Sequence, residues 1–197
     1  RSWYLAVTID REGDTPTARD KAESSVQDLL RALNADRVRL LAVNPLLLSI
    51  LALIHQRGVG LPQRRVTLYE ECVEFLLGYW RQIQGGEAAR ELAEIGGLTR
   101  QEKRTLLEPV ALWLHERGEK GLEVSRDELS GQLAQQFAER YGLPKPQADR
   151  RADEFVEIIA AHAGLLVERE AGMFAISHLT FQEYLAARAL ADRPDRL

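Results

Sequence analysis

The chain has 197 residues, of which 45% are hydrophobic, a size and composition typical of one large or two small globular domains. Its net charge is −4, with both signs spread along the chain and no basic stripe, so neither nucleic acid nor an anionic membrane is an expected partner. Cys72 is the only cysteine, which excludes an internal disulfide framework and fits a reducing, cytoplasmic location.

The first third of the sequence is predicted to be helical. Trp3, Tyr4 and Leu5 are typical of a helix already under way, and the chain begins without methionine, so we expect a fragment of a longer protein. Apolar residues at helical spacing predict a second helix over residues 17–33, and Asp36 can cap a short third one. No apolar run in this region or elsewhere approaches the ~20 residues of a membrane span.

The next segment begins at Asn44 and Pro45, which are typical of an N-cap and a first-turn proline. The helix that they open, to about residue 56, is apolar nearly all round, so we expect it to be buried on all sides. Thr67 and Glu70 form a capping-box pattern that predicts another helix, to about residue 81. Glycine pairs then interrupt the pattern, and we place a subdomain boundary near residue 95.

Three further helices are predicted beyond that boundary. Capping boxes at Thr99–Glu102 and Ser125–Glu128 start the first two, and the third spans residues 146–163. Pro109 lies inside the first of them and is expected to kink or split it.

A β-hairpin follows, with strands over residues 165–169 and 173–177 joined by a turn that contains Gly172. A capping box at Thr180 and Glu183 predicts a final amphipathic helix. Three helices and then a hairpin is the order of a winged helix. The sequence thus predicts a mainly α fold, with a helical subdomain (1–95) followed by a winged-helix subdomain (96–197) that carries a short β-hairpin and a C-terminal helix.

Two strings of residues carry a family resemblance. One is FAISHLTFQEYLAA at residues 174–187, and the other is NPLLL at residues 44–48 followed by LP at 61–62 and LYEE at 68–71. Over roughly residues 22–190 the chain resembles the helical region that follows the nucleotide-binding core in NACHT-type signal-transduction NTPases of the STAND class, which includes NOD-like receptors and their bacterial relatives. That resemblance implies signal transduction, with prokaryotic defence or programmed death as the biological setting.

His178 is the foremost candidate binding residue. It lies between a predicted strand and a predicted helix N-terminus, a place that favours anions. The resemblance implies that this histidine reaches the phosphates of bound ADP and holds the protein in a closed resting state, which ATP exchange releases to permit oligomerisation. The structural alternative is a histidine packed under the hairpin, donating to a backbone carbonyl.

Pro45 is the second candidate, because the resemblance implies that this proline packs against the adenine or ribose of the nucleotide. The alternative is that an Asn-Pro helix start needs no ligand. The family often has glycine where Asn44 stands, so only the proline is carried over.

The phosphate-binding pattern G-x-x-x-x-G-K-[ST] is absent from the sequence. We therefore expect no catalytic residues, no metal ligands and no enzyme activity in this chain. The resemblance implies that ADP or ATP, with Mg²⁺, is bound mainly by an upstream core, that a sensor lies downstream, and that the chain alone holds no nucleotide tightly. Homo-oligomers are the implied assembly after activation.

Two other functions remain open. A winged helix can bind DNA through its third helix, but here that helix mixes Arg150 and Arg151 with Asp149, Asp153 and further acidic residues, which predicts weak attraction to phosphates. A helical scaffold for protein partners would require no nucleotide at all. Cys72 lies on the apolar face of its helix and is expected to be a buried small hydrophobe rather than a nucleophile.

Overall fold

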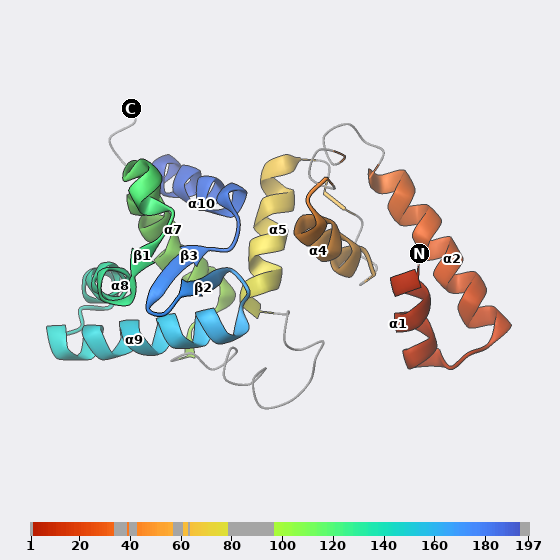
Figure 1. The fold of residues 1–197 in the computed structure, drawn as a ribbon, viewed down its shortest axis with the longest axis horizontal. Coiled ribbons are helices and arrows are strands. Elements are labelled where there is room, and N and C mark those ends of the chain that lie inside the picture. The colour runs from red at the N-terminus through yellow and green to blue at the C-terminus, as the bar shows by residue number, and fades with distance from the viewer. Residues whose placement is uncertain are drawn as a thin grey trace. The chain divides into compact units, whose positions relative to one another are not determined.

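The computed structural model describes residues 2–33, 39, 43–56, 61–62, 64–78 and 97–193. It divides into two compact units, Arg1–Cys72 and Val73–Leu197, which Figure 1 draws in the red-to-yellow and yellow-to-blue parts of its colour range. The subdomain boundary expected near residue 95 lies outside the described residues and stays a prediction. The short helix expected after Asp36 also lies outside them.

The first unit contains α1 (Ser2–Glu12), α2 (Pro16–Leu33) and α4 (Pro45–Gln56), so the three helices predicted at these places are confirmed. The α4 helix starts as expected, because Oδ1 of Asn44 accepts the backbone N–H of Leu46 at 2.8 Å. Six of its apolar side chains are buried: Leu47, Ile50, Leu51, Ala52, Leu53 and Ile54.

A tyrosine joins α1 to α4 inside this unit. The hydroxyl of Tyr4 donates to the carbonyl oxygen of Ala52 at 3.0 Å and lies 3.1 Å from Nδ1 of His55. Burial raises the pKa of Tyr4 to about 12, so the hydroxyl keeps its proton at neutral pH. The interaction of His55 with Tyr4 explains this histidine as a structural residue.

The helix that leads toward the second unit is α5 (Arg65–Gly78). It begins two residues before Thr67, so the capping box expected at Thr67 and Glu70 is wrong: both residues already lie within the helix. Cys72, at 1% exposure, is buried on this helix as predicted, and burial raises the pKa of its thiol to about 12. A thiol held protonated in this way is a poor nucleophile.

The second unit has the element order of a winged helix. After the end of α5 come α7 (Arg100–Glu116), a 3-10 turn η2 (Gly118–Gly121), β1 (Val124–Ser125), α8 (Arg126–Tyr141), α9 (Lys145–His162), β2 (Leu166–Glu170), β3 (Met173–Ile176) and α10 (Leu179–Ala191). Both predicted capping boxes are present, at Thr99–Glu102 and at Ser125–Glu128. Pro109 lies inside α7 without splitting it, because α7 continues from Arg100 to Glu116.

The turn between α8 and α9 depends on a glycine. Gly142 follows the last residue of α8 with φ +63° and ψ +27°, a left-handed conformation that L side chains rarely adopt. Its backbone N–H donates to Ala138, which completes the end of the helix. Pro144 then sets the extended backbone from which α9 begins.

Within the described residues, three strands form an antiparallel sheet in the order β1-β3-β2. Its central strand, β3, pairs Phe174 with Val124 on one side and with Glu168 on the other. The register of β2 shifts between Glu168 and Glu170, so Arg169 is the extra residue of a bulge. The two-residue strand β1 was not predicted, because it is too short to show any periodicity.

The helices of this unit cover the sheet and one another. Figure 1 shows α10 lying along α7, and α8 and α9 packed together beside the hairpin. The buried side chains that fill the space between them include Leu106, Leu133, Phe155, Ile159, Phe174, Phe181 and Leu185. Because α10 packs on α7, the start of α10 is held at the end of the sheet.

Candidate functional site

His178 is the N-cap residue of α10. Its backbone is extended, with φ −146° and ψ +136°, and Nδ1 of its ring accepts the backbone N–H of Thr180 at 3.3 Å. The same nitrogen lies 2.7 Å from Oγ1 of Thr180. The helix therefore begins at Leu179, and the capping box expected at Thr180 and Glu183 is wrong, because His178 takes the cap position two residues earlier.

The cap bears on which nitrogen of the ring carries the proton. A neutral imidazole has one nitrogen that accepts and one that carries the proton. In a neutral ring whose Nδ1 accepts the backbone N–H of Thr180, Nε2 carries the proton and is a hydrogen-bond donor. A donor at the start of a helix, where the backbone dipole is positive, is suited to an anionic oxygen.

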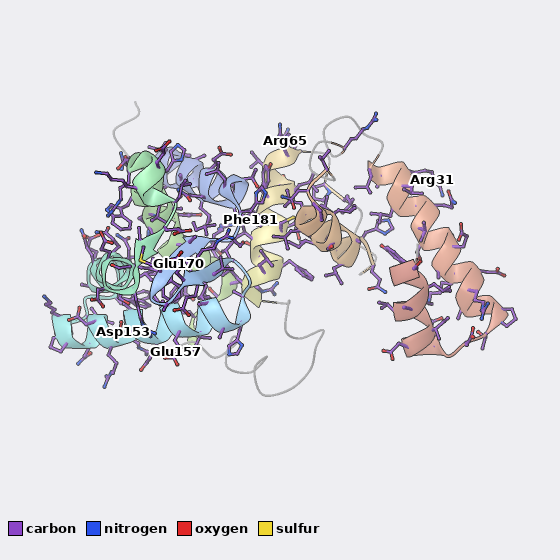
Figure 2. The ribbon with its side chains drawn as sticks, in the orientation of Figure 1. Arg31, Arg65, Asp153, Glu157, Glu170 and Phe181 are labelled. Carbon is purple, nitrogen blue, oxygen red and sulfur yellow. The ribbon has the colours of Figure 1, made fainter. Side chains whose placement is uncertain are left out.

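An aromatic contact orients the ring. Phe181 is fully buried, and its ring lies edge-on to that of His178, with 6.4 Å between centroids and 76° between planes. Figure 2 labels Phe181 at the start of α10. Directly before His178, the backbone N–H of Ser177 donates to the carbonyl oxygen of Leu165 at 2.8 Å. The strand end and the helix start are thus both anchored around His178.

A pocket of about 300 Å³ opens beside this ring. Its walls come from the segment before β1, from β2 and β3, and from the first turn of α10: Leu122, Glu123, Arg169, Ala175, Ile176, Ser177, His178, Leu179 and Gln182. Gln182 is only 3% exposed, and Arg169 and Glu123 are exposed. The lining of the pocket therefore combines apolar and polar side chains.

A chain of charges holds α10 against its neighbours within the second unit. On α7, Nη1 of Arg104 donates to Oε1 of Glu74 on α5 at 3.0 Å. Nε of the same guanidinium lies 3.3 Å from Oε1 of Glu108. Arg188 on α10 reaches the same oxygen of Glu108 at 3.6 Å. Arg104 and Glu108 are 4% and 3% exposed, so these contacts are little screened by water.

Burial raises the pKa of Glu108, and Asp192 adds to the effect, whereas Arg104 and Arg188 oppose it. The carboxyl group is thus harder to ionise in the folded chain than in water, even with two guanidinium groups beside it. These contacts position α10, and with it the cap at His178.

Residues 65–190 match the family described as a winged helix-turn-helix domain C-terminal to NACHT. The chain belongs to this family. The match covers well over half of the chain and confirms both the resemblance to NACHT proteins and the winged-helix fold. No curated protein and no solved structure matches the chain.

The two predicted binding residues occupy different places relative to this NACHT-associated domain. His178 lies within the matched range, at the junction of sheet and helix. Pro45 lies before it, in the first unit, at the exposed first position of α4. Each residue is found at the local position predicted from the sequence, and the roles of both in nucleotide binding remain predictions.

Two other features bear on the chemistry of the NACHT-associated chain. Among the residues that the structure describes, no group of three or more His, Cys, Asp or Glu side chains is arranged to hold a metal ion. In the same part of the chain, no helix has both the length and the apolar character that crossing a bilayer requires.

The pocket residues Gln182 and Arg169 and the charge network around Glu108 were not predicted from the sequence. The sequence carries a spacing signal for two of these residues. Gln182 comes four residues after His178, on the same side of a helix. Arg104 comes four residues before Glu108, on a helix face that is otherwise apolar. The position of Arg169 depends on a bulge, which has no comparable signal.

Proposed function

We propose that this chain is the regulatory arm of a nucleotide-switched NTPase of the NACHT class. In the resting state His178 donates from Nε2 to a phosphate oxygen of ADP held by a nucleotide-binding core elsewhere in the same protein. The observation that carries the proposal is the cap at α10, because it engages Nδ1 with Thr180 in a histidine that also lines a pocket.

The residues present fit a nucleoside diphosphate. Its oxygens accept hydrogen bonds and carry negative charge, and the site offers the imidazole of His178 and the guanidinium of Arg169, beside the positive end of the α10 dipole. ADP, when bound, supplies the negative charge that these groups neutralise. Pro45, exposed at the start of α4, is the residue proposed to contact the adenine or ribose.

The proposed switch requires different contacts with ADP and ATP. A ligand shifts a conformational equilibrium only by the difference between its affinities for the two states. We therefore assign to His178 a contact that forms with ADP and weakens after exchange for ATP, so that the winged-helix unit is released and homo-oligomers form. Signal transduction in prokaryotic defence is the setting that we propose.

The charges on the winged helix weigh against duplex DNA as the partner. Asp153 and Glu157 lie along α9, the helix that would enter a major groove, and both are exposed (Figure 2). Nη1 of Arg151 lies 3.9 Å from Oε2 of Glu154, and Nη2 of Arg126 lies 3.8 Å from Oε2 of Glu157. Basic groups near this helix are therefore paired with acidic ones. Such a surface attracts phosphates weakly.

The experiment uses the full-length protein and two substitutions of His178. His178→Asn keeps a side-chain acceptor for the cap, because asparagine is a good N-cap residue, but removes the imidazole donor. His178→Ala removes both. Co-purifying ADP is extracted and quantified, and we expect ADP in the wild type and a clear loss in both variants. Equal ADP in wild type and His178→Asn would assign His178 to the helix cap alone.

A further inference from the structure

The chain of charges that holds α10 centres on one carboxylate oxygen that faces two cations. Nε of Arg104 lies 3.3 Å from Oε1 of Glu108, and Nε of Arg188 lies 3.6 Å from the same oxygen. Within the described residues, Oε1 of Glu108 and Nε of Arg188 are buried and have no hydrogen-bond partner. The two guanidinium groups therefore share this oxygen, and the contact of Arg188 with it is longer than a hydrogen bond.

A second carboxylate attracts one of the two guanidinium groups. Nη1 of Arg104 donates to Oε1 of Glu74, on α5, at 3.0 Å. A hydrogen bond of this length between charged groups is stronger than the long contacts at Glu108. Arg104 and Glu108 are four residues apart on α7, so without Glu74 the guanidinium can turn fully onto Glu108. The bond from Arg104 to Glu74 therefore leaves Glu108 available to Arg188.

Burial gives this sharing its energetic weight. The side chains of Arg104 and Glu108 are 5% and 4% exposed, whereas those of Glu74 and Arg188, at the two ends of the chain of charges, are each 33% exposed. In the buried middle, water neither screens the charges nor replaces a lost partner. A change at one partly exposed end is therefore transmitted to the other end through groups that water does not reach.

The chain of charges begins on the helix in which the two units divide. The division falls within α5, just before Val73, so Glu74 is the second residue of the second unit. Arg188, at the other end of the chain of charges, lies on α10. A displacement of α5 away from α7 would separate Glu74 from Arg104 before it disturbed the buried middle.

We propose that this chain of charges is a latch through which α5 controls how firmly α10 is held on α7. While Glu74 binds Arg104, Glu108 remains available to Arg188. When α5 moves away, Arg104 closes on Glu108, and α10 loosens because Arg188 loses its partner. The latch requires no nucleotide, so it does not depend on the role proposed for His178. It lets the winged-helix domain respond to movement of the helix in which the two units divide.

The test measures amide hydrogen exchange of α10 by mass spectrometry of the full-length protein, because exchange from a helix reports how often that helix opens. Arg188→Met removes the contact with Glu108 and should speed exchange of α10 about tenfold. Glu74→Gln keeps the shape of a side chain on another helix but removes its charge, and should speed exchange of α10 about threefold. The double variant should exchange no faster than Arg188→Met alone, because the latch acts on α10 through Arg188.

Two further variants are matched controls. Glu71→Gln removes a partly exposed charge from α5, three residues before Glu74, and should leave the exchange of α10 unchanged. Arg193→Met breaks the exposed contact with Glu116 at 3.7 Å, outside the chain of charges. Its effect on α10 should multiply with that of Glu74→Gln, because the two substitutions act independently.

Three outcomes would overturn the latch. One is exchange of α10 at the wild-type rate in Glu74→Gln, and another is an equal acceleration by Glu71→Gln. The third is a double variant that exchanges about thirtyfold faster than wild type, because independent sites combine as the product of their single effects. If Arg188→Met does not fold, the comparison of Glu74→Gln with Glu71→Gln still decides.

Discussion

Nδ1 of His178 lies 2.7 Å from the hydroxyl oxygen of Thr180 and 3.3 Å from its backbone nitrogen. This relationship gives one ring two separate tasks. Nδ1 caps α10, and Nε2 is the donor proposed for the nucleotide. The two tasks can be separated by substitution.

His178→Ala should lower the free energy of unfolding of the chain by about 1 kcal/mol, because it removes an N-cap acceptor. His178→Asn should cost only a few tenths of a kcal/mol on the same scale, since its amide oxygen can accept from Thr180. Urea unfolding followed by circular dichroism measures both. Equal losses for the two variants would mean that the cap contributes nothing to stability.

Arg104→Met should destabilise the second unit by about 3 kcal/mol, the magnitude typical of removing one member of a buried ion pair. The substitution leaves Glu108 buried with one guanidinium fewer and removes the donor to Glu74. A matched control is Arg193→Met, whose ion pair with Glu116 at 3.7 Å is exposed at both ends. That variant should change stability by less than about 0.5 kcal/mol. Similar losses for both would contradict the assignment of a buried network.

The raised pKa of Glu108 predicts a pH dependence. The folded chain holds the proton of Glu108 more tightly than the unfolded chain does. The contribution of this proton to the free energy of unfolding is therefore fully present below the ordinary pKa of 4.5. It is lost as the pH rises from 4.5 through the raised value. Glu108→Gln should remove this decline in stability. Thermal melts between pH 4 and pH 8 would detect the change, because these ~4 pH units span the ordinary and perturbed range of a carboxyl pKa. An unchanged slope in the variant would contradict the raised pKa.

Two glycines of α8 should respond to alanine with opposite signs. Gly142→Ala forces a left-handed backbone, φ +63°, on a side chain that meets nothing within 4 Å, and should cost about 1 kcal/mol through the backbone alone. Gly131 lies inside the helix with equally open space around it. Gly131→Ala should therefore stabilise the chain by roughly 0.5–1 kcal/mol. Stabilisation by Gly142→Ala would contradict the left-handed end of α8, and destabilisation by Gly131→Ala would contradict the open space around Gly131.

A capping-box pattern predicted the start of a helix correctly only where the helix did not begin at an earlier residue. Thr99 and Ser125 form their boxes as expected, but the same T-x-x-E pattern at Thr67 and Thr180 lies inside helices that begin earlier. Beside Thr180, a histidine supplies the acceptor instead. A capping pattern is a local signal, and it cannot say which of two nearby acceptors the helix will use.

The pocket shows what a sequence pattern leaves out. The place of His178 between strand and helix follows from residue order, whereas Arg169 reaches the pocket through a bulge and β1 exists only by pairing with β3. The bulge depends on the register within the β2–β3 hairpin, and β1 depends on a contact with a strand far along the chain. Gln182 lies between these cases: its spacing from His178 is visible in the sequence, but its burial is not.

The most direct test of the account is the ratio of ADP affinity to ATP affinity in the full-length protein, measured by titration calorimetry for wild type and His178→Asn. We expect the substitution to weaken ADP binding about tenfold, as for one hydrogen bond to a charged group, and to leave ATP binding nearly unchanged, so that the ratio falls. An unchanged ratio, whether both affinities fall together or neither does, would contradict the claim that His178 distinguishes the resting nucleotide from the activating one.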